Sequence, residues 1–182
     1  MEIKKVLVIG AGTMGNGIAH VFAQSGYNVV LCDTSENALN KGYSTIEKNM
    51  GRQVSKGKMT EEDMKAALSK ITKSTTITDG KDADLVVEAI IENKDVKFKL
   101  FRELDEMTRP EVILASNTST ISITEIGAVT KKPDKVIGMH FMNPVPMMRL
   151  VEVIKGIATS DETYQTVKAL SEKLGKIPVL AN

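Results

Sequence analysis

A glycine-rich turn near the amino terminus constrains the fold of this chain more than any other feature. Residues 10–15 read Gly-Ala-Gly-Thr-Met-Gly, a G-x-G-x-x-G pattern that alone is weak evidence. Here it follows the apolar run 6–9 and opens an amphipathic stretch at 15–24. The next apolar run, 28–32, ends at Asp33, at the distance expected of the acidic residue in a dinucleotide site. The sequence therefore predicts a strand–helix–strand unit that binds a dinucleotide.

Each glycine of this turn has a physical role in such a site. Gly10 permits the tight turn, Gly12 lets a pyrophosphate reach the backbone, and Gly15 lets the helix pack closely on the strand. Asp33 would accept hydrogen bonds from ribose hydroxyls and repel a 2′-phosphate, which favours NAD over NADP; the alternative is a simple turn residue. The predicted cofactor loop comprises Gly10, Ala11, Gly12, Thr13, Met14 and Gly15.

Alternating strand and helix patterns continue along the chain and predict one domain, 1–182. Such alternation is typical of an α/β, Rossmann-type doubly wound fold with a mostly parallel sheet. A helical-hairpin insert is expected at about 36–70, with Ser35 and Thr60 as helix caps. Further strands are predicted at 71–76, 85–89, 112–115, 136–139, 150–154 and 177–179, and helices at 94–107, 121–129 and 163–174.

Composition excludes several classes of function. A net charge of +1 argues against general nucleic-acid binding. The single cysteine, Cys32, allows neither a disulfide nor a cysteine metal site within one chain, so we expect no metal and a reducing, cytoplasmic setting. We expect neither a signal peptide nor a membrane span, because no stretch approaches the roughly 20 apolar residues that a span needs.

Polar residues follow two of the predicted strands. Asn117 and Ser119 follow 112–115, and His140 and Asn143 follow 136–139. Ligands of open α/β sheets bind at the carboxyl ends of strands, so these groups should face one crevice; helix capping is the alternative for Asn117 and Ser119.

Two ionisable residues lie in the apolar stretch 139–153. His140 and Glu152 are either a core histidine and a solvent-facing strand residue, or an acid–base pair shielded from water by apolar neighbours. The other histidine, His20, is expected to be a core residue with no partner.

Several segments together resemble the 3-hydroxyacyl-CoA dehydrogenase family, and most of all its bacterial 3-hydroxybutyryl-CoA dehydrogenases. The similarity runs in register along the whole chain. It implies NAD-dependent interconversion of a short-chain 3-hydroxyacyl-CoA, such as 3-hydroxybutyryl-CoA, and its 3-ketoacyl-CoA, such as acetoacetyl-CoA. The segments are 10–15, Asp33, 86–89 with Glu92 and Lys97, 115–119, 138–144 and 150–153.

The resemblance also implies roles for individual residues. His140 and Glu152 match the family's catalytic pair, and Ser119 matches a serine that touches substrate and nicotinamide. The insert carries more basic than acidic residues from 41 to 58, which indicates either a solvated face or a complement to CoA phosphates. Implied cofactor contacts are Glu92, Lys97, Asn117, Ser119 and Asn143, and implied substrate contacts are Ser119, Asn143 and Lys56.

The chain departs from the family pattern in two respects. Met142 stands where members commonly have a second phenylalanine. The family's C-terminal helical domain, with a catalytic asparagine and the dimer contacts, is lacking, so we expect a weakly active part of a protein that forms a homodimer or larger assembly.

Two other functions stay open at this stage. A different β-hydroxyacid dehydrogenase would need a carboxylate clamp and gives no reason for His140 with Glu152. A non-catalytic NAD-binding module is the second.

Overall fold

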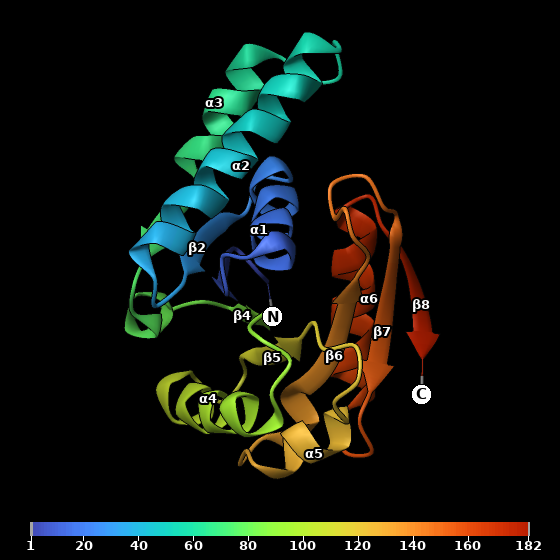
Figure 1. The fold of residues 1–182 in the computed structure, drawn as a ribbon. Coiled ribbons are helices and arrows are strands. Elements are labelled where there is room, and N and C mark those ends of the chain that lie inside the picture. Colours follow the sequence, from blue (N-terminus) through green and yellow to red (C-terminus); the bar gives the residue numbers. More distant parts are fainter. Residues whose placement is uncertain (1, 182) are drawn as a thin grey trace.

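The computed structural model describes residues 2–181 and contains one eight-stranded sheet with helices on both faces (Figure 1). The strand order is β3-β2-β1-β4-β5-β6-β7-β8, and every pair from β3 to β6 is parallel. This confirms the doubly wound, mostly parallel prediction, while Met1 and Asn182 of the predicted domain lie outside the described residues. The strands are β1 Lys5–Ile9, β2 Asn28–Cys32, β3 Ile71–Ser74, β4 Leu85–Glu88, β5 Ile113–Ser116, β6 Val136–Phe141, β7 Leu150–Lys155 and β8 Ile177–Ala181.

The helices follow the predicted order, with the expected hairpin between β2 and β3. In Figure 1, α2 and α3 form an arm that projects beyond α1. Ser35 caps α2 by accepting from the Ala38 N–H, and Thr60 caps α3 by accepting from the Asp63 N–H, as predicted. The α-helices are α1 Thr13–Gln24, α2 Glu36–Ser55, α3 Glu61–Ser69, α4 Lys94–Met107, α5 Ile123–Ala128 and α6 Asp161–Lys173; 3₁₀ turns occupy Ile77–Gly80 and Pro133–Lys135.

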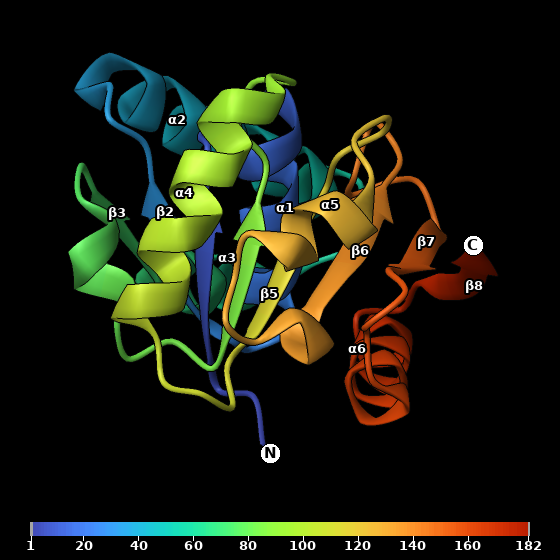
Figure 2. The same cartoon turned by 90° about the horizontal axis from the view of Figure 1, so that it is seen from below.

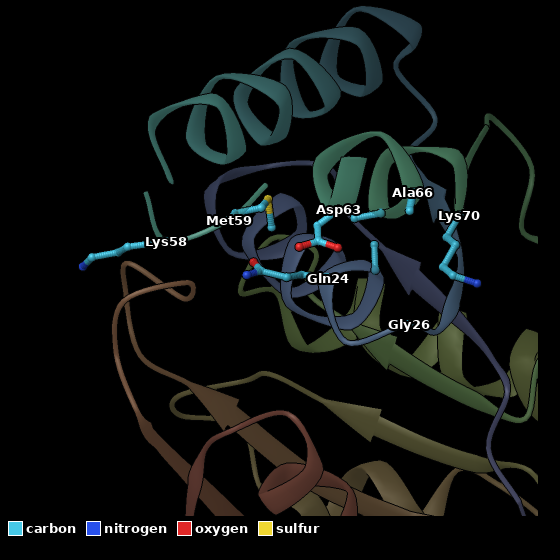
Figure 3. Close-up of a pocket in the computed structure, with 9 residues that line it drawn as sticks. Gln24, Gly26, Lys58, Met59, Asp63, Ala66 and Lys70 are labelled. Carbon is cyan, nitrogen blue, oxygen red and sulfur yellow. The ribbon is translucent and has the colours of Figure 1, made fainter. Parts of the chain in front are cut away.

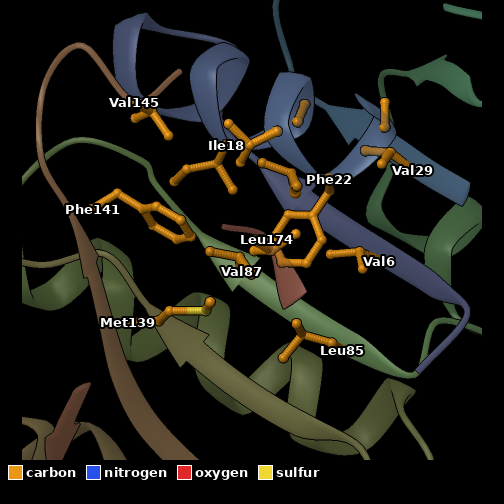
Figure 4. Packing of buried hydrophobic residues seen from close by; sticks show 14 of the residues in the cluster. Val6, Ile18, Phe22, Val29, Leu85, Val87, Met139, Phe141, Val145 and Leu174 are labelled. Atoms are coloured by element: carbon orange, nitrogen blue, oxygen red, sulfur yellow. The ribbon is translucent and has the colours of Figure 1, made fainter. Parts of the chain in front are cut away.

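Two hydrophobic clusters pack on opposite faces of the sheet. On one face, Ile18 and Phe22 of α1 cover strand residues that include Val6, Leu85 and Val87 (Figure 4). On the other face, α4 and α5 cover a second cluster (Figure 2). Because the central strands are buried on both faces, their sequences read as continuous apolar runs.

Strand β7 reverses the direction of the sheet, which the sequence did not predict. It pairs antiparallel with β6, and β8 then pairs parallel with β7. The pairing sets His140 directly opposite Glu152. Strand β6 also runs two residues further than predicted, since the ladder continues through the polar His140.

Among residues 2–181, none of the helices combines the length and the apolar character that crossing a membrane requires.

Candidate active site

The glycine loop has the geometry that its sequence predicts. Gly10 has φ +102°, and a Cβ there would lie 2.4 Å from the Ala89 carbonyl oxygen. A Cβ on Gly15 would lie 1.6 Å from the Gly10 oxygen, so the helix start and the loop touch through backbone alone. A Cβ on Gly12 would meet nothing within 4 Å. The loop is therefore closely packed at Gly10 and Gly15 and open at Gly12.

Helix α1 begins at this loop without a side-chain cap. Gly12 is its N-cap and offers no acceptor, whereas each of the other described α-helices has a capping side chain. The first-turn N–H groups of α1 are thus available to an anion, which the helix dipole also favours. These groups and the open space at Gly12 fit a dinucleotide pyrophosphate.

Asp33 lies beside the loop and holds it in place. Its Oδ2 accepts from the Ala11 N–H at 2.9 Å, and its Oδ1 accepts from the Ser35 N–H at 2.9 Å. Asp33 therefore does stabilise the turn, as the alternative suggested. Each carboxylate oxygen can accept a further hydrogen bond, so this contact is compatible with binding a ribose hydroxyl.

A cleft of about 390 Å³ is lined by the glycine loop, by α2 and by the loop between β6 and β7. Helix α2 approaches closely because of Gly42, where a Cβ would lie 2.6 Å from the Ala11 oxygen. Lys41, Thr45 and Asn49 repeat at every fourth residue of α2 and line this wall. The sequence alone did not distinguish Lys41 from the other basic residues of 41–58 as a ligand contact. The opposite wall consists of Asn143, Pro144, Val145 and Pro146.

Three predicted site residues form a continuous hydrogen-bonded series. The His140 Nδ1 lies 2.7 Å from the Glu152 Oε2, and the His140 Nε2 lies 3.2 Å from the Ser119 Oγ. The antiparallel register creates the first contact, because directly opposed residues project to the same face of a sheet. His140 is thus paired with side chains and is not a core histidine bonded to a backbone carbonyl.

The expected shielding of this pair from water is wrong for the described residues. The Glu152 side chain is 38% exposed and that of His140 is 19% exposed. The cause is strand alternation: Met139, Phe141 and Val151 are buried in the cluster under α1, while the pair faces the other side.

The loop after β5 is held by polar contacts, and neither Asn117 nor Ser119 caps a helix. Asn117 Oδ1 accepts from the Phe141 N–H at 2.8 Å, and Ser122 caps α5. Glu92 accepts from the Thr118 hydroxyl and from the Thr120 hydroxyl. Burial raises the pKa of Glu92, but the hydrogen bond from Thr118 and the charge of Lys97 outweigh this effect, so the pKa lies below its usual value. Glu92 is thus held as a carboxylate beside the loop that carries Ser119.

Of the predicted contact residues outside the glycine loop, only Asn143 lines the cleft among the described residues; Glu92, Asn117, Ser119, Lys97 and Lys56 do not. Lys97 is 1% exposed, and its ammonium group is paired with the buried carboxylate of Glu88. It also lies 3.5 Å from Glu92 Oε2. Lys56 is an exposed residue at the C-cap of α2, at the far end of the hairpin from the glycine loop. Sequence reasoning gave Glu88 no role of its own; an acidic residue closing the apolar run 85–87 was the available signal.

His20 was expected to lack a partner, and that expectation is wrong. Its Nε2 lies 2.9 Å from Gln24 Oε1 and 3.1 Å from Gln53 Nε2, while its Nδ1 is buried without a hydrogen bond. Burial lowers the pKa of His20. It contacts α2 and does not face the glycine loop.

A second hollow, of about 380 Å³, lies between the C-terminal end of α1 and α3 (Figure 3). Among residues 2–181, none of the predicted site residues lines it. Within the same range, no group of three or more His, Cys, Asp or Glu side chains could hold a metal ion.

The sheet order, the uncapped glycine loop and Asp33 define a dinucleotide-binding domain. A family model described as "3-hydroxyacyl-CoA dehydrogenase, NAD binding domain" matches residues 5–182. The chain belongs to this family.

Individual relatives support the same family assignment. The chain is 50% identical over 182 residues to the probable 3-hydroxybutyryl-CoA dehydrogenase of Bacillus subtilis, covering 100% of this chain and 63% of that protein. It is 53% identical over 174 residues to the 3-hydroxybutyryl-CoA dehydrogenase of Bradyrhizobium diazoefficiens, covering 96% and 59%. A crystal structure of the (S)-3-hydroxybutyryl-CoA dehydrogenase from Ralstonia eutropha superposes with a TM-score of 0.96 at 49% identity, covering 98% of this chain and 63% of that one. The chain thus spans about three-fifths of the length of these relatives.

Proposed function

We propose that this chain is the NAD-binding and proton-transferring part of a dehydrogenase that interconverts 3-hydroxybutyryl-CoA and acetoacetyl-CoA. The observation that carries the proposal is the series Ser119–His140–Glu152 on the sheet that also bears the glycine loop. The names of the relatives support the substrate.

His140 would exchange the proton of the C3 hydroxyl. When its Nδ1–H donates to Glu152, its Nε2 is left as the acceptor that faces Ser119 and the substrate. In oxidation, Nε2 takes the hydroxyl proton; in reduction, it returns that proton to the C3 oxygen. Ser119 would donate its hydroxyl hydrogen to the same oxygen and stabilise charge developing there. Bound NAD supplies the hydride acceptor.

Cofactor binding would divide between the glycine loop and the strand ends. The first-turn N–H groups of α1 would hold the pyrophosphate, and Asp33 would hold the adenosine ribose. The nicotinamide half would then extend toward Asn143, which lines the same cleft as Gly12, and toward Asn117 and Glu92. Lys97 is enclosed by its carboxylate partners, so we propose no direct cofactor contact for its ammonium group.

The acyl-CoA would lie along α2. Lys41 faces the cleft, and Lys56 is exposed at the end of the same helix. Both ammonium groups can pair with the phosphates of CoA, and such pairing weakens as salt rises.

The test is NADH oxidation with three substrates: acetoacetyl-CoA, a longer 3-ketoacyl-CoA and a free 3-keto acid. The full product of the gene is compared with this 182-residue chain. We expect acetoacetyl-CoA to be the preferred substrate of the full product, with the 182-residue chain binding NADH but turning over very poorly. Preference for the free acid would instead indicate a different β-hydroxyacid dehydrogenase. NADH binding without turnover in both samples would indicate a non-catalytic module.

A further inference from the structure

A fully buried carboxylate lies beneath the candidate active site and has no part in the proposed proton transfer. Glu88 ends β4 and is 0% exposed. Its Oε1 accepts from the Ile90 N–H at 2.8 Å and from the ammonium group of Lys97. Its Oε2 accepts from the Ser116 hydroxyl at 2.6 Å. One side chain thus joins the loop after β4, helix α4 and the end of β5.

The same contacts continue into the loop that carries Ser119. The Ser116 Oγ accepts from the Thr118 N–H at 3.1 Å, and the Glu88 carbonyl oxygen accepts from the Asn117 N–H at 2.8 Å. Asn117 in turn holds the N–H of Phe141, the residue next to His140. An unbroken series of hydrogen bonds therefore runs from β4 across β5 to β6.

Both oxygens of the Glu88 side chain have hydrogen-bond partners inside the protein. The Ile90 N–H and the Lys97 ammonium can only donate, and both meet Oε1, whereas the Ser116 hydroxyl meets Oε2 and can also accept. A buried ion pair is weak evidence for stability, because apolar residues of similar volume often serve as well. What the pair does provide is a fixed geometry for three neighbouring backbone segments.

We propose that Glu88, paired with Lys97, is a positioning residue that orients residues 116–119 and so maintains the contact between Ser119 and His140. The inference rests on the proposed dehydrogenase function for its kinetic readout. It assigns Lys97 an indirect role, through Glu88 and Glu92.

The experiment compares the double variant Glu88→Gln/Lys97→Met with a matched control, Lys132→Met. The double variant removes both charges, so that neither is left buried and unpaired. Lys132 is also a buried lysine, and its ammonium donates to Thr108 Oγ1 and the Arg109 oxygen at 2.7 Å each, at the opposite edge of the sheet. Ser116→Ala, which removes one link of the series, is the milder variant if the double variant does not fold.

In the full product of the gene, we expect the double variant to lower kcat about tenfold or more and to weaken NADH binding by a smaller factor, because Asn117 and Glu92 are also proposed to contact the cofactor. Ser116→Ala should act in the same direction, and Lys132→Met should leave kcat unchanged. Unchanged kcat in both site variants, or an equal loss in the control, would overturn the inference.

A second readout does not depend on turnover. This measurement uses the 182-residue chain. Because it has two histidines, ¹⁵N spectra of labelled histidine resolve the ring of His140 from that of His20. We expect the double variant to shift the His140 Nε2 signal, which reports the contact with Ser119, and the control to leave it in place. If the wild-type protein does not reduce acetoacetyl-CoA, the proposed function fails while this measurement still tests the positioning role. An unshifted signal would contradict that role.

Discussion

Two alanine substitutions in the glycine loop should separate cofactor binding from folding. At Gly12, φ is −67° and ψ is −167°, which alanine adopts readily, and its Cβ would meet nothing within 4 Å. An alanine N-cap is less favourable than glycine, but alanine also restricts the unfolded chain, so we expect a net change in stability within about 1 kcal/mol. At Gly15, the added Cβ would lie 1.6 Å from the Gly10 oxygen. The Gly10 oxygen belongs to the backbone and the added Cβ is fixed rigidly to the backbone of α1, so α1 must move.

Both substitutions should weaken NADH binding, but for different reasons. The Gly12→Ala methyl would project into empty space at the N-cap of α1, where we propose that the pyrophosphate binds. Losing one hydrogen bond to a charged phosphate is worth about 1.5–3 kcal/mol, which corresponds to an increase in Kd of roughly 10- to 100-fold. Gly15→Ala should lose NADH binding only because the fold is disturbed. We expect this substitution to lower the free energy of unfolding by about 1–3 kcal/mol or more.

The assays are urea denaturation and a fluorescence titration with NADH, both on this chain. We expect Gly12→Ala to keep its denaturation midpoint and lose affinity, and Gly15→Ala to lose both. Wild-type affinity in Gly12→Ala would refute the proposed position of the pyrophosphate. A fully stable Gly15→Ala would refute the close contact between helix and loop.

Further predictions concern three other residues. His140→Ala in the full product should lower turnover at least ~10²-fold with NADH affinity nearly unchanged; a loss confined to NADH titrations would contradict its role. Burial, with the charges of two nearby aspartates, raises the pKa of Cys32 from 9.0 to about 11. The folded thiol keeps its proton where the unfolded thiol loses it, so this contribution to stability is full below pH 9.0 and lost toward pH 11. Cys32→Ala should reduce the alkaline fall in unfolding free energy, and an unchanged fall would count against this. Lys176 donates to the carbonyl oxygens of Val145 and Met148, so Lys176→Met should speed hydrogen exchange in 144–149 and weaken NADH binding; unchanged exchange would show that the loop does not need it.

Much of the fold was predictable because its signals are local. The dinucleotide-binding unit, with its glycine turn after the first buried strand and Asp33 after the second, can be recognised within about 30 residues of sequence. The caps Ser35 and Thr60 depend on N–H groups three residues away, and both were correct. His140, Glu152 and Ser119 were proposed as a group from a family resemblance, and the structure brings them into contact.

The features that the sequence could not predict are the direction of one strand and the solvent exposure of individual side chains. An alternating strand reads alike in both directions, so nothing in residues 150–155 showed that β7 runs antiparallel. The apolar neighbours of His140 suggested a dry site, but alternation sends them to the opposite face. Lys97 could be placed on α4 by its sequence, yet its burial against Glu88 depends on how the helix packs.

The reversal at β7 also bears on how quickly the contact between His140 and Glu152 can form. His140 and Glu152 are only 12 positions apart, and a hairpin brings them together. Closing so short a loop costs less chain entropy than a crossover to a parallel strand, so this contact can form early in folding. Ser119, 21 positions from His140, has to wait for β5 and β6 to pair across α5. The contact between His140 and Glu152 thus depends on a local hairpin, whereas the contact between Ser119 and His140 depends on the pairing of β5 with β6.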